Sequence, residues 1–554
     1  MKLFSNRQSR SKLIILFITI SAFIFGFTMS DGDYFFKINK SIDIFGRVYK
    51  EIALNYVDEV DPEKFMESGI DGLLSTLDPY TSFITESEAE EVELITVGKY
   101  GGIGVSVGTR DGYITILSLM EGYSAQRQGI QPGDRIIEVD GKSIAGLKAE
   151  DLRTLTRGEP GSELRLKIER DGEDKHLEFS LVREEIQLKN ITYSDFIKDS
   201  IAYIKLERFT RGAGDELRLA LKDLKLKHQI GGVILDLRGN PGGLLDVAVD
   251  VVEKFLPKGS LIVSTRGRQP ESERKFFATE DPLLQQVPLV VLVNNRSASA
   301  SEIVAGAVQD LDRGIILGTR TFGKGLVQTI TPLVYNTQLK LTTAKYYTPS
   351  GRCIQEIDYT HKNKDGIFSP VPDSAKKTFK TLKGRLELEA GGIQPDTVVS
   401  EPEQSEFYNY LIRKAMFFKF ANLYVQTHKD TPKAFETAEL TEELKIYLDS
   451  IKVTFQDEVE TKYLELCVKA EKNKYSSAVR EQFEKLKSML KEEKPDYVRQ
   501  YADEILPTLR AEIMNRYKGE RGRVEELLKD DAQVIAASGL IGNKKEYARR
   551  LESK

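Results

Sequence analysis

The stretch from about Glu184 to Ser400 alternates short apolar runs with amphipathic segments, and this alternation limits the possible folds more than any other feature. The run "IAYIKL" leads to "GDELRLALKDLKLK", "GGVILDL" leads through "RGNPGG" to "LLDVAVDVVEKFL", and "VPLVVLV" leads through "NRSASAS" to "EIVAGAVQDL". Repeated strand, loop and helix patterns predict a mostly parallel sheet with crossover helices. Ligand sites in such sheets lie beyond the carboxyl ends of the strands, so we expect the site at the "RGNPGG" and "NRSASAS" loops.

The chain of 554 residues is too long for one hydrophobic core, and its pattern changes along its length. Residues 34–96 carry apolar side chains at helical spacing, and residues 97–183 consist of short alternating runs between turns, which predicts a small β-rich domain. Residues 401–554 are rich in Lys and Glu and carry apolar residues at helical spacing, which predicts a solvated helical bundle used for assembly. We therefore expect a multidomain α/β protein whose core spans residues 184–400.

The N-terminus has the pattern of a targeting segment. Residues 13–29 form an uncharged run that four basic residues precede: Lys2, Arg7, Arg10 and Lys12. This pattern is typical of a signal peptide or of a single membrane anchor within residues 1–30. The length of the run fits both, so cleavage near Ser30 and retention in the inner membrane stay open. In either case we expect the body of the protein to be exported, into the periplasm.

Composition argues against several kinds of site. A formal net charge of −5 gives no reason to expect nucleic acid as a partner, and Cys353 and Cys467 do not imply a disulfide framework. The glycine group "YGGIGVSVG" leads into a strand pattern rather than a helix, which argues against a dinucleotide loop. The four histidines are isolated from one another and lack metal-ligand spacing. We expect no metal and no cofactor.

Three serines stand at the start of a predicted helix in "NRSASASEIVAG". A serine becomes a nucleophile when a neighbouring base takes its proton and donors stabilise the oxyanion. Ser297 and Ser301 are four residues apart and share a helical face, whereas Ser299 points elsewhere. Ser299 would also benefit from the helix dipole and from a free amide such as that of Ala300.

A lysine is the candidate base, because no histidine lies near these motifs in the sequence. Lys324 in "TRTFGKGLVQT" has the apolar neighbours Phe322, Leu326 and Val327, and burial lowers the pKa of a lysine toward the range in which it accepts a proton. Gln328, four residues on, would share a strand face with Lys324. The residues alone leave a plainer interpretation open, in which the serines cap a helix and "GKG" is a turn.

Several motifs, in this order along the chain, carry a family resemblance. They are "LNYVDEVDPEKFMESGIDGLLSTLDPYTSFI", "DLRGNPGGLL", "NNRSASASEIVAGAVQD", "GTRTFGKGLVQT", "YYTPSGRCIQ" and "GGIQPD". From about Tyr34 to Ser400 the chain closely resembles the carboxyl-terminal processing peptidases, also called tail-specific proteases. The resemblance implies a crotonase/ClpP-like α/β protease core with a PDZ domain at residues 97–183.

The resemblance also implies the roles of the site residues. Ser299 matches the nucleophile, Lys324 the general base and Gln328 the glutamine that orients this lysine. The oxyanion hole of the family corresponds to the amide of Ala300 and to an amide of the glycine loop, from either Gly242 or Gly243. The expected activity is that of a serine endopeptidase with a Ser-Lys dyad.

The β-rich segment is similar to the PDZ domain of the family. In "YGGIGV", the backbone amides of Gly102, Ile103 and Gly104 would receive the terminal carboxylate of a protein substrate, whose tail adds as a strand to the sheet edge. Arg157 matches an arginine that, in relatives, is implied to couple this domain to the protease. An adaptor or activating ligand and assembly into a homodimer are further expectations.

Two other functions stay open at this stage. One is a catalytically silent PDZ scaffold that gathers partners at the membrane. The other follows from the likeness of the core to the crotonase fold, whose members act on acyl thioesters. The second function requires glutamate acid/base groups and a coenzyme A pocket, and the sequence contains no motif for either.

Overall fold

The computed structural model describes residues 33–88, 92, 94, 96–198, 200–362 and 368–552. The expected signal peptide or anchor, residues 1–30, lies outside the described residues. Contacts divide the chain into two compact units, one made of residues up to Ile84 with 330–333 and 337–341, the other of the remainder. Within the described ranges, no helix has both the length and the apolar character needed to cross a membrane.

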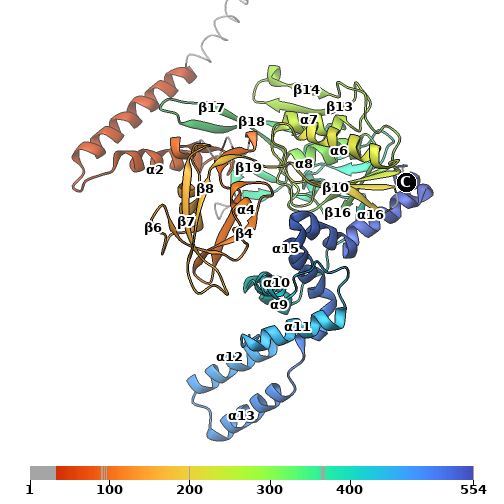
Figure 1. Cartoon of the computed structure of the whole chain (residues 1–554). Coiled ribbons are helices and arrows are strands. Elements are labelled where there is room, and N and C mark those ends of the chain that lie inside the picture. Colours follow the sequence, from red (N-terminus) through yellow and green to blue (C-terminus); the bar gives the residue numbers. More distant parts are fainter. Residues whose placement is uncertain are drawn as a thin grey trace, which may run out of the picture. The chain divides into compact units, whose positions relative to one another are not determined.

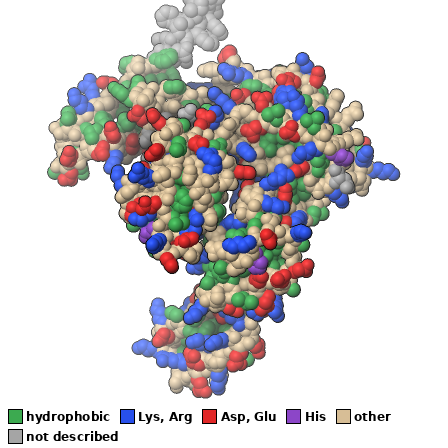
Figure 2. Space-filling view, in the orientation of Figure 1, with side chains coloured by type: hydrophobic (Ala, Val, Ile, Leu, Met, Phe, Trp, Pro, Cys, Tyr) green, Lys and Arg blue, Asp and Glu red, His purple; other side chains and the backbone are tan. Residues whose placement is uncertain are grey.

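The smaller unit contains two helices and a short strand. A helix over 33–55 is followed by α2 (Pro62–Leu74), and the Asp61 side chain caps α2 by accepting the amides of Glu63 and Lys64. The ring of Tyr49 stacks on that of Phe65, with centroids 5.4 Å apart. Strand β1 (Ser82–Ile84) pairs antiparallel with the start of β18 (Gln338–Tyr347). Apolar side chains remain exposed along the first helix, as Figure 2 shows at upper left.

A six-stranded sheet forms the centre of the larger unit. Its order is β10 (Ile191–Lys198), β11 (Ile201–Leu206), β12 (Gly232–Asp236), β15 (Leu289–Val293), β16 (Ile315–Gly318) and β23 (Thr397–Val398). Only the β10 edge strand is antiparallel to its neighbour in this sheet. The prediction of a mostly parallel sheet is therefore confirmed, and both expected loops follow strands β12 and β15 at their carboxyl ends.

Helices cover both faces of this sheet (Figure 1). One core cluster joins the sheet to α6 (Ala213–Lys227), α7 (Leu245–Glu253) and α8 (Ala300–Asp310). A second cluster joins the other face to α16 (Ala532–Gly542) and α17 (Lys544–Arg550). Because both faces are covered, every residue of β12 and β15 is buried. The far C-terminal end of the chain thus supplies part of the central core.

Smaller sheets flank the central one. Strand β13 (Leu261–Gly267) pairs with β14 (Arg274–Phe277) and with the end of β18, and β18 also pairs with β17 (Leu326–Pro332). Two further hairpins are β19 (Ile357–Lys362) with β20 (Phe368–Pro370), and β21 (Thr378–Lys380) with β22 (Leu386–Leu388). Short 3-10 turns lie at Glu86–Glu88, Pro270–Ser272 and Asp373–Ala375.

The β-rich segment forms its own sheet in the order β3 (Val105–Arg110), β4 (Tyr113–Leu119), β5 (Arg135–Val139), β7 (Glu163–Glu169) and β8 (Leu177–Val182), with β6 (Lys142–Ser143) beside β5. Helices α4 (Ser124–Arg127) and α5 (Ala149–Thr156) complete the core of this module. Strand β2 (Lys99–Gly102) pairs with β9 (Glu184–Gln187) just outside the sheet. Among the described strands, β3 is an edge strand with one neighbour.

The C-terminal region is helical, as its apolar spacing predicts. It comprises α9 (Glu406–Arg413), α10 (Met416–Thr427), α11 (Thr437–Ser450), α12 (Glu458–Lys472), α13 (Ser477–Glu492), α14 (Tyr497–Gln500) and α15 (Ala502–Asp530), followed by α16 and α17. An aromatic-rich core holds α9, α10, α11 and α15 together. Cys353 and Cys467 are both free thiols.

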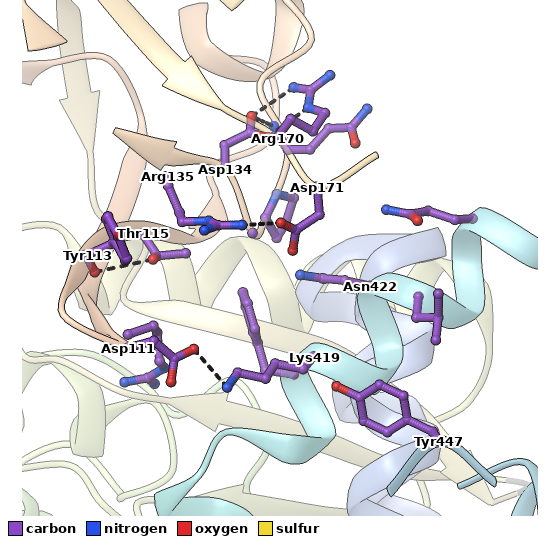
Figure 3. A pocket seen from close by; sticks show the side chains of 17 residues that line it. Asp111, Tyr113, Thr115, Asp134, Arg135, Arg170, Asp171, Lys419, Asn422 and Tyr447 are labelled. Carbon is purple, nitrogen blue, oxygen red and sulfur yellow. Dashed lines mark hydrogen bonds and ion pairs between the residues drawn. The ribbon is translucent and has the colours of Figure 1, made fainter. Parts of the chain in front are cut away.

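The β-rich module and helix α10 face each other across a cavity of about 310 Å³ (Figure 3). Lys419 of α10 pairs with Asp111 at 2.8 Å across this cavity. Gly133 lies so close to Asn422 that an added Cβ would approach the amide nitrogen to 2.4 Å. On the β-rich side Arg170 pairs with Asp134, so ion pairs line the cavity both within the module and across it.

Candidate active site

Ser299 lies at the start of α8, directly after the loop that follows β15. Its backbone has φ +55°, a value that residues with a side chain rarely adopt, and strain of this kind is typical of functional turns. Ser297 and Ser301 are fully buried and donate hydrogen bonds to the carbonyls of Leu237 and Asn240, at 2.8 and 2.9 Å. Of the three serines, only Ser299 is partly exposed. Helix α8 begins at Ala300, after Ser297 and Ser299, so the expected shared helical face of Ser297 and Ser301 does not account for this difference.

Glu302 joins the segment of Ser299 to the segment of Lys324. One of its carboxylate oxygens accepts the amides of Ser299 and Lys324, at 2.8 and 2.9 Å. The other oxygen accepts the hydroxyl of Thr321 at 2.6 Å and the amide of Gly323 at 2.7 Å. Burial raises the pKa of Glu302 to about 7, although these four hydrogen bonds favour the ionised form. A single carboxylate thus fixes the backbones of both candidate catalytic residues.

Tyr346 of β18 joins the same two residues on their carbonyl side. Its buried hydroxyl lies 2.7 Å from the carbonyl oxygen of Lys324 and 3.1 Å from that of Ser299. Burial, with the nearby Glu302, raises the pKa of Tyr346, so the hydroxyl keeps its proton and can donate it. Ser299 and Lys324 are therefore held together from both sides of the backbone.

Lys324 lies in the loop before β17 and is partly buried. Of its apolar neighbours in the sequence, Leu326 is buried and Phe322 is 48% exposed. The side-chain amide of Gln328 donates to the hydroxyl of Thr342 at 3.1 Å. Because Lys324 precedes the strand, the alternation of a strand does not relate its side chain to that of Gln328.

The glycine loop packs directly on Ser299. A Cβ on Gly242 would lie 2.9 Å from both the Ser299 Cβ and the Ala300 nitrogen, and φ at Gly242 is +98°. No other residue fits this position without moving the serine. The amide of Gly242 donates to the side-chain oxygen of Asn240 at 2.9 Å. The Asn240 carbonyl in turn accepts the Ala298 amide at 3.1 Å, which ties the loop to the serine segment.

A cluster of buried charges supports the start of the glycine loop. Asp236 at the end of β12 is fully buried and accepts the Tyr203 hydroxyl at 2.6 Å. Burial alone would raise the pKa of Asp236, but the charges of Lys205 and Arg238 and the hydrogen bonds from Arg238 and Tyr203 lower it to about 2. Asp236 therefore stays ionised and fixes Arg238, the second residue after β12.

Sequence reasoning missed Glu302, Tyr346, Asn240 and Asp236. Each of them lies within or beside a quoted motif. Glu302, Tyr346 and Asn240 act through hydrogen bonds to backbone that is distant in the sequence, and Asp236 acts through the side chains of Tyr203 and Arg238. A buried acidic residue in the apolar face of α8 was the available signal for Glu302, because an unpaired carboxylate in such a place is costly. The other three residues carry no comparable local signal.

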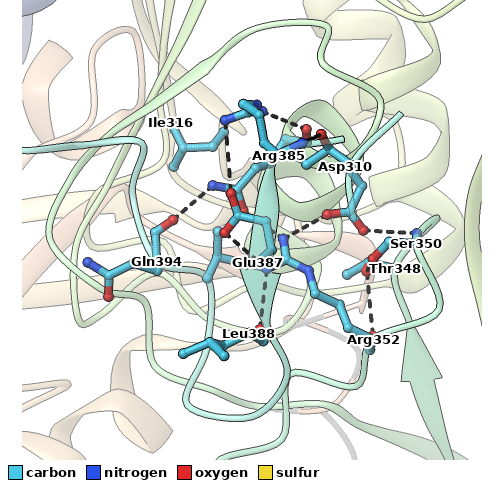
Figure 4. Close-up of polar contacts among 12 residues, drawn as sticks. Asp310, Ile316, Thr348, Ser350, Arg352, Arg385, Glu387, Leu388 and Gln394 are labelled. Atoms are coloured by element: carbon cyan, nitrogen blue, oxygen red, sulfur yellow. Dashed lines mark hydrogen bonds and ion pairs between the residues drawn. The ribbon is translucent and has the colours of Figure 1, made fainter. Parts of the chain in front are cut away.

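The far end of α8 rests on a second charge network (Figure 4). Arg352 of "YYTPSGRCIQ" is buried and pairs with Asp310, at the end of α8, at 2.8 Å. Arg385 pairs with Asp312 at 2.7 Å and also with Asp396 of "GGIQPD". These contacts explain why the two downstream motifs accompany the serine motif: they hold the helix on which Ser299 lies.

The predicted tail-binding residues lie together in the β-rich module. Gly102 ends β2, Ile103 is buried, and Gly104 has φ +77° just before the edge strand β3. The Arg157 guanidinium lies over the ring of Tyr100, 5.1 Å from its centroid. Arg157 therefore contacts the start of the predicted carboxylate loop.

Three family models match successive parts of the chain. They are peptidase family S41 at residues 200–362, the PDZ domain at residues 91–169, and the C-terminal helical domain of a probable PDZ-protease at residues 407–541. The PDZ match covers the β-rich module up to the end of β7, and the S41 match contains both Ser299 and Lys324.

Curated relatives agree with these matches. The chain is 39% identical over 376 residues to the carboxy-terminal-processing protease of Bartonella bacilliformis, covering 66% of this chain and 86% of that protein. It is 34% identical over 348 residues to the carboxy-terminal processing protease CtpB of Bacillus subtilis, covering 62% and 72% of the two chains. Among solved structures, a photosystem II D1 C-terminal processing protease matches with TM-score 0.35 and 24% identity, over 63% of this chain and 85% of that one.

The matched regions contain the strained serine turn, the glycine loop packed on it and the separate β-rich module. The extent and identity of the first relative show the family. The chain belongs to the carboxy-terminal processing proteases, PDZ-containing serine peptidases of family S41.

Proposed function

We propose that the protein is an endopeptidase that uses a dyad of Ser299 and Lys324. The observation that carries this proposal is the double attachment of the two residues. Their amides share one oxygen of Glu302, and their carbonyls both lie within 3.1 Å of the Tyr346 hydroxyl. Such fixation supplies the preorganised geometry that a nucleophile and its base require.

Catalysis would proceed by acyl transfer. Neutral Lys324 takes the hydroxyl proton of Ser299 as the serine oxygen attacks the scissile carbonyl. Lys324 then gives this proton to the leaving amine as the peptide bond breaks, and water hydrolyses the acyl-enzyme by the same route. Gln328, which already donates to Thr342, would position the Lys324 amine from β17.

The oxyanion would be bound by the amide of Ala300 and one amide of the glycine loop. Ala300 is the first residue of α8, so its amide has the favourable end of the helix dipole behind it. Of the two loop candidates, the amide of Gly242 already donates to Asn240. We therefore assign the second donor to Gly243.

The PDZ module would select substrates by their C-terminal tails. A substrate tail can add to β3, which is an edge strand, while its carboxylate meets the loop at Gly102, Ile103 and Gly104. Arg157, stacked on Tyr100, would transmit occupancy of this loop. We expect apolar C-termini of exported proteins to be the substrates, with cleavage near the tail.

The N-terminal segment and the helical regions suggest where the protein is located and how it assembles. We propose export to the periplasm, with residues 13–29 either removed or kept as an inner-membrane anchor. We also propose a homodimer formed through the helical ends, which the exposed Phe35, Phe36 and Ile42 support. An adaptor or activating ligand would act on the same assembly.

Cleavage of an unfolded reporter with an apolar tail tests the dyad. The wild type should cut the reporter, whereas Ser299→Ala and Lys324→Ala should each lose at least 1,000-fold in kcat. Ser297→Ala is the matched control, since this serine is a buried structural residue. Equal cleavage by the wild type and both dyad variants would refute the assignment, and a wild type that never cuts would favour the scaffold.

A further inference from the structure

The glycine loop beside Ser299 is in contact with the far C-terminal end of the chain. Arg238 begins the loop, and its guanidinium donates to Asp531 and Gln533 at the start of α16, each at 3.1 Å. A second guanidinium nitrogen lies 2.7 Å from the other Asp531 oxygen. This contact joins residues 293 positions apart in the sequence.

Asp531 has two tasks in this contact. Its Oδ1 atom accepts the amides of Gln533 and Val534, at 2.9 and 3.0 Å, and so caps α16. Through both of its oxygens it also pairs with Arg238. The helix that it caps is firmly placed, because Val534, Ala537 and Ile541 are buried against the central sheet. The carboxylate of Asp531 is therefore a fixed point on the core.

Arg238 is held between this fixed point and Asp236. Asp236 lies on its other side, with Oδ2 2.6 Å from the guanidinium, and the Lys205 amine donates to the Arg238 carbonyl at 2.9 Å. Burial disfavours the charge of Arg238, but Asp236 and Asp531 together raise its pKa, so it stays charged. The two carboxylates and two cations balance, and the removal of one carboxylate leaves a nearly buried positive charge in excess.

The glycine loop connects the fixed side chain of Arg238 to the candidate nucleophile Ser299. Between Arg238 and Gly243, the side-chain amide of Asn240 anchors the chain by donating to the Leu206 carbonyl. Gly242 packs against Ser299, since a Cβ added to this glycine would lie 2.9 Å from the Ser299 Cβ and from the Ala300 nitrogen. Oxyanion donors work only when they are aimed correctly, and small displacements cost large factors in rate. The direction of the Arg238 side chain therefore bears on the direction of the loop amides.

We propose that Asp531 is a positioning residue for the peptidase reaction, which through Arg238 fixes the glycine loop against Ser299. The C-terminal helical region thereby completes the active site rather than serving only for assembly. The inference rests on the proposed function, because it takes Ser299 as the nucleophile and the loop as an oxyanion donor.

Asn in place of Asp531 tests this role, since asparagine is also a good helix cap but carries no charge. In the full-length protein, purified in detergent, Asp531→Asn should lower kcat for the unfolded reporter at least 10-fold and change KM less than 2-fold. Asp531→Glu keeps the charge and should restore much of kcat. The matched control is Asp496→Asn, because Asp496 also caps a helix and pairs with a cation, Lys445, far from the loop.

Hydrogen–deuterium exchange gives a second measurement that needs no substrate. Amides from Gly239 to Gly243 should exchange faster in Asp531→Asn than in the wild type, and at the wild-type rate in Asp496→Asn. If Asp531→Asn and Asp496→Asn have equal kcat and equal exchange rates, the positioning role of Asp531 is refuted and the proposed function is not. If Ser299→Ala cuts as fast as the wild type, the proposed function fails first and the inference falls with it.

Discussion

Two buried carboxylates flank the candidate site, and their environments are opposite. Asp236 under the glycine loop has two cations beside it, Lys205 and Arg238, and its pKa is lowered to about 2. Glu302 under the serine turn accepts only neutral donors, and burial raises its pKa to about 7. Complete burial is common to both residues, so the neighbours decide the charge state. The comparison separates a permanently charged anchor from a carboxylate that titrates near neutral pH.

Removal of the anchor should have the largest effect on stability. Asp236→Asn leaves two cations without their buried partner, so we expect the free energy of unfolding to fall by about 3–5 kcal/mol. Chemical denaturation measures this change. Asp215→Asn is the control, because Asp215 is an exposed partner of Arg218 and should cost less than about 0.5 kcal/mol. A loss at Asp236 no larger than at Asp215 would show that the buried cluster is not an anchor.

The contribution of Glu302 to stability should depend on pH. Because folding raises the pKa of Glu302 from 4.5 to about 7, its contribution to stability is fully present below pH 4.5 and is lost as the pH rises through 7. The loss should be roughly 3 kcal/mol for a shift of this size. Glu302→Gln lacks the titrating group. The difference in unfolding free energy between this variant and the wild type should therefore change by this amount between pH 4.5 and 8.

Denaturation of the wild type and Glu302→Gln at several pH values in this range provides the comparison. Four hydrogen bonds to the carboxylate act against burial, and if they outweighed it the trend would reverse. A stability difference that stays constant, or that moves toward the wild type as the pH rises, would therefore contradict a raised pKa at Glu302.

The hydroxyl of Tyr346 should contribute least to stability but measurably to catalysis. Tyr346→Phe removes the contact with the carbonyls of Lys324 and Ser299 and should cost about 1–2 kcal/mol in unfolding free energy. Loss of alignment between the dyad residues should also lower kcat about 10-fold. Tyr347→Phe is the control, since the Tyr347 ring lies against Arg266 instead. Equal kcat in both variants would show that the hydroxyl does not align the dyad.

The sequence predicted the parallel sheet and the two loops at its carboxyl edge because those features follow from local apolar patterns. The helical face expected to be shared by Ser297 and Ser301 does not apply, because α8 begins only at Ala300. The sequence did not predict that Glu302 and Tyr346 fix the backbones of Ser299 and Lys324, because hydrogen bonds to distant amides and carbonyls leave no periodic pattern. The contact of Asp531 with Arg238 is less visible still, because nothing in "DDAQVIAASGL" distinguishes it from an ordinary capped helix.

Family resemblance supplied what physical reasoning left open. The residues alone did not decide between a Ser-Lys pair and a capped helix beside a turn, since Lys324 lies in an irregular loop whose shape no spacing rule fixes. Side-chain direction in this glycine-flanked loop, where Phe322 is 48% exposed, cannot be predicted from alternation either.

The most direct test of the account is the identity of the acyl-enzyme. The full-length protein is mixed with the unfolded reporter, quenched in acid during turnover, and digested for mass spectrometry. We predict that the wild type carries a substrate fragment as an ester on Ser299, and that Lys324→Ala carries none. An acyl group on another residue, or an equal yield of ester in Lys324→Ala, would contradict the dyad of Ser299 and Lys324.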